Sequence, residues 1–192
     1  MDPILADLLK ATILATVPLV AVFITWRLTM RSQERQRKRE TVAGWHRLLI
    51  EVTQCQERLR GVATNQVKSP LYRLPTDTYR LHFHGLMVAS ELAPADIDTF
   101  QRYYQFVDQV NDGLDLAALA LQAHDDPALT KQYERNRQKA AKVVEKEGKP
   151  RSPYDDVRGA IFAQLQLLGD GRYVEWLKTQ EAPRIRDVAE ES

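Results

Sequence analysis

The sequence predicts an all-α protein: an N-terminal single transmembrane helix that continues into a long amphipathic helix, then a cytoplasmic bundle of four or five helices. Three observations carry this prediction. An unbroken apolar run extends from Ala11 to Trp26, and a basic stretch follows from Arg27 to Arg39. Beyond them, apolar residues recur every three or four positions, and no stretch shows the two-residue alternation typical of strands in series.

The apolar run has the length of a membrane span. A helix needs about 20 mostly apolar residues to cross a hydrocarbon core, and the segment from Leu8 to Leu28 supplies them. Its charged residues, Lys10 and Arg27, stand near the ends, where long side chains can reach the headgroups. A cleaved secretory signal would carry positive charge before its core and a cleavage site after it, and this chain reverses both features. A buried core helix of a soluble protein is the other alternative.

The basic stretch predicts the orientation of the chain. Six basic residues and one acid occupy positions 27–39, and basic residues stay on the cytoplasmic side of a membrane. We therefore expect a bacterial inner (plasma) membrane location, with the N-terminus outside and everything after Trp26 in the cytoplasm. Each basic side chain gains about 1 kcal/mol from anionic headgroups. The predicted membrane-surface contacts are Arg27, Arg31, Arg35, Arg37, Lys38 and Arg39. Nucleic-acid binding is a less economical explanation of these charges.

Composition limits the domain organisation. We expect an anchor at 1–30, one cytoplasmic helical domain at 31–179 and a flexible tail at 180–192, because the residues beyond the anchor suffice for a single modest core. The single cysteine, Cys55, excludes an internal disulfide, which fits a reducing compartment. Because Cys55 stands in an apolar stripe, a buried structural thiol is favoured over a reactive one.

Apolar periodicity places the first soluble helices. From Arg27 to about Val62 no proline interrupts the chain, and one helix face carries Trp45, Leu48, Leu49, Val52, Cys55, Leu59 and Val62. A loop is expected over residues 65–75. Thr76 or Asp77 then caps a short helix that carries Tyr79, Leu81, Phe83, Leu86 and Met87.

Three further helices follow. Pro94 begins the strongest of them, with a stripe of Ile97, Phe100, Tyr104, Val107, Val110, Leu114, Ala118 and Leu121. The next runs from Asp126 to Glu147 and has a thin apolar face of Leu129, Tyr133, Ala140 and Val144. Ser152 and Pro153 begin the last long helix, which carries Val157, Ile161, Leu165 and Leu168 and ends at residues 169–171. A short turn of helix is expected over residues 173–177.

Candidate catalytic and metal sites are weak. His82 and His84 are two residues apart, so on a helix they point in nearly opposite directions, and surface or packed histidines are favoured. Asp108, Asp112 and Asp115 share one helix face, where carboxylates can serve acid–base chemistry or bind cations, but a solvated acidic face is favoured. The turn at 169–172 lacks the spacing of a phosphate loop. We predict no catalytic, cofactor-binding or metal site.

The soluble helices differ in charge. Residues 91–126 carry eight acids and one arginine, whereas residues 131–151 carry eight basic residues and three acids. Two consecutive helices of opposite sign can lie antiparallel and neutralise one another, and this explanation is favoured over a docking site for an acidic partner or nucleic acid.

A resemblance supports this architecture. The run of residues 74–79, followed by Leu92-Ala93-Pro94, then Tyr103-Tyr104 and Asn111, resembles a pattern in uncharacterised bacterial single-pass membrane proteins with a cytoplasmic all-helical domain. It covers about a third of the chain. The resemblance implies a bacterial inner membrane and a helical domain, but no activity, substrate or catalytic residue.

Three functions remain open on these grounds. The first is a non-enzymatic, membrane-tethered helical interaction or scaffold module, with anionic lipid and a protein partner or second copy as partners, and with no nucleic acid, small-molecule substrate or cofactor. The second is a membrane sensor or effector of a stress or phage-defence system. The third is an enzyme that uses the acidic face around Asp108, Asp112 and Asp115.

Overall fold

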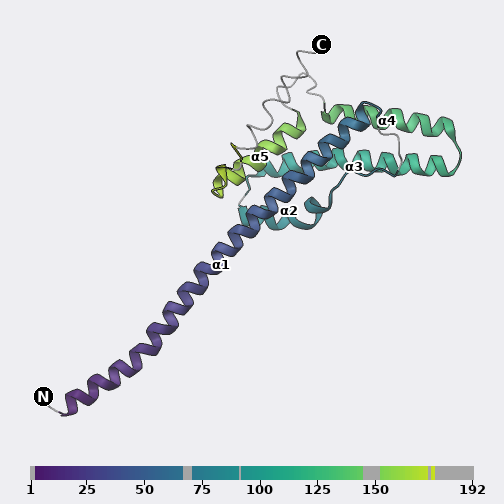
Figure 1. The fold of residues 1–192 in the computed structure, drawn as a ribbon. Coiled ribbons are helices and arrows are strands. Elements are labelled where there is room, and N and C mark those ends of the chain that lie inside the picture. The colour runs from purple at the N-terminus through teal and green to yellow at the C-terminus, as the bar shows by residue number, and fades with distance from the viewer. Residues whose placement is uncertain (1–2, 67–70, 91, 145–151, 173, 176–192) are drawn as a thin grey trace. The chain divides into compact units, whose positions relative to one another are not determined.

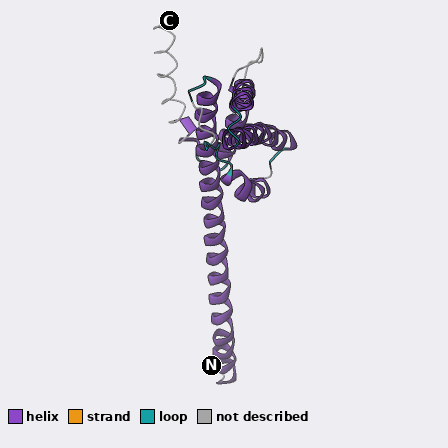
Figure 2. Ribbon diagram, turned by 90° about the vertical axis from the view of Figure 1, so that its right-hand side faces the viewer, coloured by secondary structure: helices purple, strands orange, loops and turns teal. Residues whose placement is uncertain are grey.

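The computed structural model describes the chain at residues 3–66, 71–90, 92–144, 152–172 and 174–175, with residues 3–19 described by their helical backbone alone. Within these residues the protein has five helices and no strand, so the prediction of an all-α fold is confirmed (Figure 2). The helices are α1 (Pro3–Ala63), α2 (Asp77–Ser90), α3 (Pro94–Gln122), α4 (Asp126–Val144) and α5 (Pro153–Leu167). The chain divides into two compact units, Met1–Glu40 and Thr41–Ser192.

Helix α1 covers both the predicted membrane span and the amphipathic helix predicted to follow it. In the part of the chain that the structure describes, no helix combines the length and the apolar character that crossing a membrane requires. Residues 8–19, which form more than half of the predicted span, lie outside the residues whose side chains are described. The predicted tail at 180–192 and the predicted end of the fourth soluble helix at Glu147 also lie outside the described residues.

The core of the second unit is built on the apolar stripe of α1. All seven residues predicted for this stripe, from Trp45 to Val62, are buried. The Trp45 ring lies 5.8 Å from the ring of Phe100, and its indole nitrogen donates a hydrogen bond of 2.9 Å to the Ser90 hydroxyl. Removing this apolar surface from water supplies the main driving force for folding of the unit.

Helix α3 begins at Pro94, as predicted, because a proline in the first turn has no N–H to leave unpaired. Most of its predicted stripe is buried: Phe100, Tyr104, Val107, Val110 and Leu114. The prediction is wrong in the last turns, where Ala117 is buried and Leu121 is 48% exposed. These turns pack against α4 through the side of α3 that holds Gly113, so the buried face differs from the one that the upstream stripe predicts.

Helices α3 and α4 lie side by side and run in opposite directions (Figure 1). A left-handed residue, His124 with φ 56°, ends α3, and the Asp125 N–H donates to the Ala120 carbonyl at 3.1 Å. The face predicted for α4 is only partly confirmed. Ala140 is buried and Leu129, Tyr133 and Val144 are half-buried, but the other buried residues are Gln132, Asn136 and Val143. Two amides therefore occupy the centre of this interface, because Gly113 leaves room for the Asn136 side chain.

Helix α5 begins and ends as predicted. The Ser152 hydroxyl accepts the Asp155 N–H, and the Asp155 carboxylate accepts the Ser152 N–H in return, so the two residues form a capping box. At the other end Gly169 has φ 86°, and the Asp170 N–H donates to the Leu165 carbonyl at 2.9 Å. A helix-ending turn thus accounts for the glycines at 169–171.

Candidate functional site

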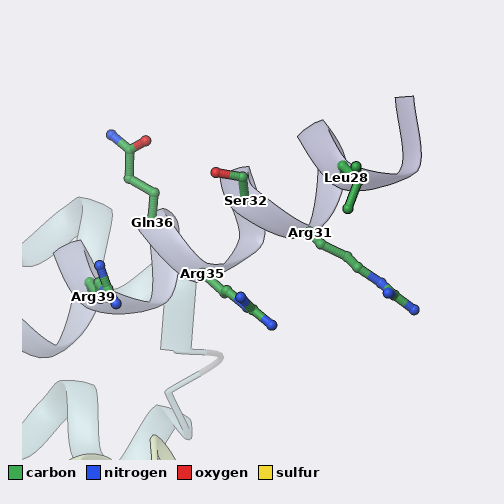
Figure 3. A pocket seen from close by; sticks show the side chains of 6 residues that line it. All are labelled: Leu28, Arg31, Ser32, Arg35, Gln36 and Arg39. Carbon is green, nitrogen blue, oxygen red and sulfur yellow. The ribbon is translucent and has the colours of Figure 1, made fainter. Parts of the chain in front are cut away.

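The predicted membrane-contact residues form a basic surface on α1. Every side chain from Val20 to Glu40 is exposed. A shallow, open hollow on one face of the helix is lined by Leu28, Arg31, Ser32, Arg35, Gln36 and Arg39 (Figure 3). Arg31 and Arg35, one turn apart, extend in nearly the same direction in this view. At 100° per residue, all six predicted residues except Arg37 fall within about 120° of the helix circumference.

An exposed apolar surface precedes these charges on the same helix. Its large side chains are 44–68% exposed: Val20, Val22, Phe23, Ile24, Trp26, Leu28 and Met30. The rings of Phe23 and Trp26 lie 6.0 Å apart. The hydroxyls of Thr25 and Thr29 each donate 2.8 Å hydrogen bonds to the carbonyl four residues earlier, so neither needs water as a hydrogen-bond acceptor.

The acidic face of α3 fastens the segment between α1 and α2. Arg80, near the start of α2, donates a 2.7 Å hydrogen bond to the carboxylate of Asp108, and Arg73 of the connecting segment pairs with Asp115. Between them, Asn111 holds the backbone of Leu74 from both sides, accepting its N–H at 2.8 Å and donating to its carbonyl at 3.1 Å. An amide that pairs with both backbone groups of one residue reproduces the bonding of a neighbouring strand.

These contacts give the predicted acidic set a structural explanation. The three carboxylates line an open, mixed-charge depression together with Arg58, Arg73 and Arg80. Two of them are paired, and Asp112 is exposed beside them. Sequence periodicity placed the acids on one face but gave no sign of the arginines opposite, because these come from three other parts of the chain: Arg58 from α1, Arg73 from the connecting segment and Arg80 from α2.

A buried carboxylate that sequence reasoning missed lies at the start of α2. Glu51 of α1 is 4% exposed and accepts the backbone N–H groups of Thr78 and Tyr79 at 2.5 and 3.1 Å. It also accepts the Tyr104 hydroxyl at 2.8 Å, and the rings of Tyr79 and Tyr104 stack with centroids 3.8 Å apart. A carboxylate at a helix N-terminus satisfies unpaired N–H groups and meets the positive end of the helix dipole. Helix α2 is thus capped by a side chain from another helix.

Cys55 is a buried thiol, as its place in the stripe predicted. Its Sγ donates to the Pro75 carbonyl at 3.0 Å. Burial, and secondarily the charge of Glu51, raise its pKa from 9.0 to about 12. Burial likewise raises the pKa of Tyr103 and of Tyr104, whose ionisation Glu51 opposes further. A thiol with so little thiolate at neutral pH is a poor nucleophile.

Unfolding of the protein is expected to become easier above about pH 9, because the unfolded chain ionises Cys55 there and the folded chain does not. The contribution of Cys55 to stability is fully present below the pKa of the thiol in the unfolded chain. It is lost as the pH rises toward the pKa of the thiol in the folded chain. The free energy of unfolding should fall by about 1.4 kcal/mol per pH unit per group, with Tyr103 and Tyr104 adding to the slope above about pH 10. Urea unfolding of wild type and Cys55→Ala from pH 8 to 11 measures this. If the free energy of unfolding of Cys55→Ala fell between pH 9 and 10 as steeply as that of the wild type, Cys55 would not be the group responsible.

The histidines are not gathered into a metal site. His82 and His84 are exposed on α2, and His46 Nε2 lies 2.7 Å from a carboxylate oxygen of Asp170, in the turn after α5. Among the described residues, no three His, Cys, Asp or Glu side chains are arranged to hold a metal ion.

The charges of α3 and α4 do not pair as the sequence led us to expect. Among the described residues, no ion pair joins the two helices, and the one polar contact we find from a basic side chain of α4 to α3 runs from Lys139 Nζ to the Gln109 carbonyl at 3.4 Å. Three acids of α3 pair elsewhere: Asp98 with Arg102 of the same helix, Asp108 with Arg80 of α2 and Asp115 with Arg73 of the α1–α2 segment. On α4, Arg137 and Gln138 bond the carboxylate of Glu134, which lowers its pKa to about 2.

Comparisons of the chain with protein-family models, with curated proteins and with solved structures give no match. The resemblance to bacterial single-pass membrane proteins stays a prediction.

Proposed function

We propose that the protein is a non-enzymatic, membrane-tethered helical interaction or scaffold module at the cytoplasmic face of a bacterial inner membrane. One observation carries the proposal. Seven large apolar side chains between Val20 and Met30 are exposed, and a run of basic residues follows them directly on α1. Apolar surface of this extent is costly in water and marks a site of contact with lipid or protein.

The order of side chains along α1 supports lipid as the contact. The threonine hydroxyls within the apolar surface are satisfied by α1 itself, which a hydrocarbon environment requires. Trp26 stands at the boundary between apolar and basic residues, where interfacial aromatics are enriched. The basic surface that follows suits anionic headgroups on the cytoplasmic side. In the sequence, residues 8–19 continue this apolar character toward the N-terminus.

The surroundings of the acidic face support a role without catalysis. Two of its three carboxylates are ion-paired: Asp108 with Arg80 of α2, and Asp115 with Arg73 of the segment before α2. Each of these ion pairs joins α3 to another part of the chain, which is a structural role for the carboxylate. The enzyme hypothesis thus loses two of the groups on which it depended.

Membrane fractionation tests the anchor. Full-length protein is expected in the membrane pellet after alkaline carbonate washing, whereas Val20→Asp/Phe23→Asp/Ile24→Asp is expected largely in the supernatant, because carboxylates in the span oppose insertion. Leu71→Asp/Leu81→Asp/Val88→Asp is the matched control, since these side chains are also exposed but lie outside the predicted span. Wild-type protein in the supernatant would contradict the proposal.

Orientation is tested by cysteine labelling. The single native thiol, Cys55, is fully buried, so it gives little background with a membrane-impermeant maleimide. Asp2→Cys should be labelled in intact spheroplasts, and Gln36→Cys only after the membrane is opened. The reverse pattern would overturn the proposed topology.

A further inference from the structure

Helix α4 carries a row of basic side chains that form no ion pair with any other described residue. Lys131, Arg135, Lys139 and Lys142 are exposed and follow one another at spacings of four, four and three residues. At 100° per residue they fall within about 80° of the helix circumference, beside the face that α4 buries against α3. Apart from the Lys139 contact to a backbone carbonyl, no hydrogen bond or ion pair joins this row to the described residues.

Among the described residues, no acid forms an ion pair with this row. Glu134, the acid within α4 beyond its first turn, is held by Arg137 and Gln138 on another side of the helix. Asp108 and Asp115 of α3 are taken by Arg80 and Arg73. Within the described part of the chain, the row is therefore a positive strip without an ion pair, about 16 Å long at 1.5 Å per residue.

An exposed leucine lies beside the strip. The contact of Lys139 with Gln109 shows which side of α3 borders the basic row. Leu116 follows Gln109 by seven residues, or two turns, so it lies on the same side of α3, and it is 54% exposed. The cations can attract an acidic partner electrostatically, and the leucine can supply an apolar contact that anchors it.

We propose that the strip of Lys131, Arg135, Lys139 and Lys142, together with Leu116, docks an acidic amphipathic helix of a partner protein. A helix laid along α4 has the same rise per residue, so carboxylates at spacings of four, four and three meet the four cations in register. A flat anionic membrane fits less well. A flat surface would cover the exposed Asp112, one turn from Leu116 on the same side of α3, together with the strip, whereas a partner helix can place its carboxylates over the four cations alone.

The test uses the full chain in neutral detergent and two labelled, alanine-based helical peptides of identical composition. One has glutamates at spacings of four, four and three with a flanking leucine, and its isomer distributes the glutamates around the helix. Fluorescence anisotropy should show the first peptide binding at least about tenfold more tightly than its isomer. Lys131→Glu/Arg135→Glu/Lys142→Glu should remove this preference.

Matched variants separate the strip from net charge. Arg47→Glu/Arg60→Glu/Arg172→Glu changes the charge equally at exposed residues elsewhere and should alter affinity less than about twofold. Leu116→Ala should weaken binding about threefold with the salt dependence unchanged. Equal binding of the two peptides would overturn the proposal. A loss of DNA-duplex or anionic-vesicle binding in Lys131→Glu/Arg135→Glu/Lys142→Glu that exceeds its loss of peptide binding would also overturn it, because residues 27–39 are the same in both proteins.

This inference rests on the interaction-module part of the proposed function and not on the anchor. A protein that leaves the membrane pellet yet still discriminates the peptides would remove the anchor alone. If the protein stays in the membrane pellet but binds both peptides equally, only the proposal of the docking strip is contradicted.

Discussion

Replacing Glu51 with alanine is expected to lower the free energy of unfolding of the second unit by about 2–4 kcal/mol. In the wild type, the N–H groups of Thr78 and Tyr79 and the hydroxyl of Tyr104 all donate to this carboxylate. The substitution leaves these three donors without an acceptor. A buried donor without an acceptor costs more than the net value of the bond it lost. Urea unfolding followed by circular dichroism measures the effect.

Smaller changes at this cluster should give graded results. Glu51→Gln keeps one acceptor oxygen but turns the other into a donor that faces N–H groups, so we expect a loss of about 1–3 kcal/mol. Tyr104→Phe removes one bond and should cost about 1 kcal/mol. Glu57→Gln, at an exposed position of the same helix, should stay within about 0.5 kcal/mol of wild type. If Glu51→Gln and Glu57→Gln unfold at the same urea concentration, Glu51 does not cap α2.

Gly113→Ala is expected to destabilise the α3–α4 hairpin by about 1–3 kcal/mol, although alanine is the better helix former. An added Cβ would come within 1.9 Å of Asn136 Oδ1 and 3.2 Å of Gln132 Nε2. Asn136 is 1% exposed, and its side chain must break its 3.1 Å hydrogen bond to Gln132 to move away. The same urea experiment reports the loss.

Two matched variants make this expectation specific. Gly85→Ala, in α2, meets no atom within 4 Å and should stabilise the protein by about 0.5–1 kcal/mol, as alanine does in an open helix position. Asn136→Ala should make room for the new methyl group, so Gly113→Ala should cost less in that background than alone. Additive costs in the double variant would show that the two side chains do not collide.

Periodicity predicted the parts of this fold whose burial repeats along one helix face. The stripe from Trp45 to Val62 and the start of the stripe after Pro94 are buried as expected, because each packs on a broad core that matches the 3.6-residue repeat. The ends at Ser152 and Gly169 were also predictable, since capping side chains and a left-handed glycine act on their own backbone.

Contacts between residues far apart in sequence were not predictable from periodicity. Glu51 carries a charge within an apolar stripe, and its partners lie 27 to 53 residues away, so no local pattern marks it as a cap. On α4 the choice of Gln132 and Asn136 as the buried face depends on a missing side chain at Gly113, on another helix.

Sequence alone determined the all-α class, the helix ends with local caps, and the order of apolar and basic residues on α1, because propensity, capping and composition act within a few residues of one another. Only the tertiary structure decided which charges pair. The acids of α3 meet Arg73 and Arg80 instead of the cations of α4, since ion pairs form by distance in space, and packing sets that distance. As a consequence, the basic row on α4 has no ion pair among the described residues, which the sequence did not predict.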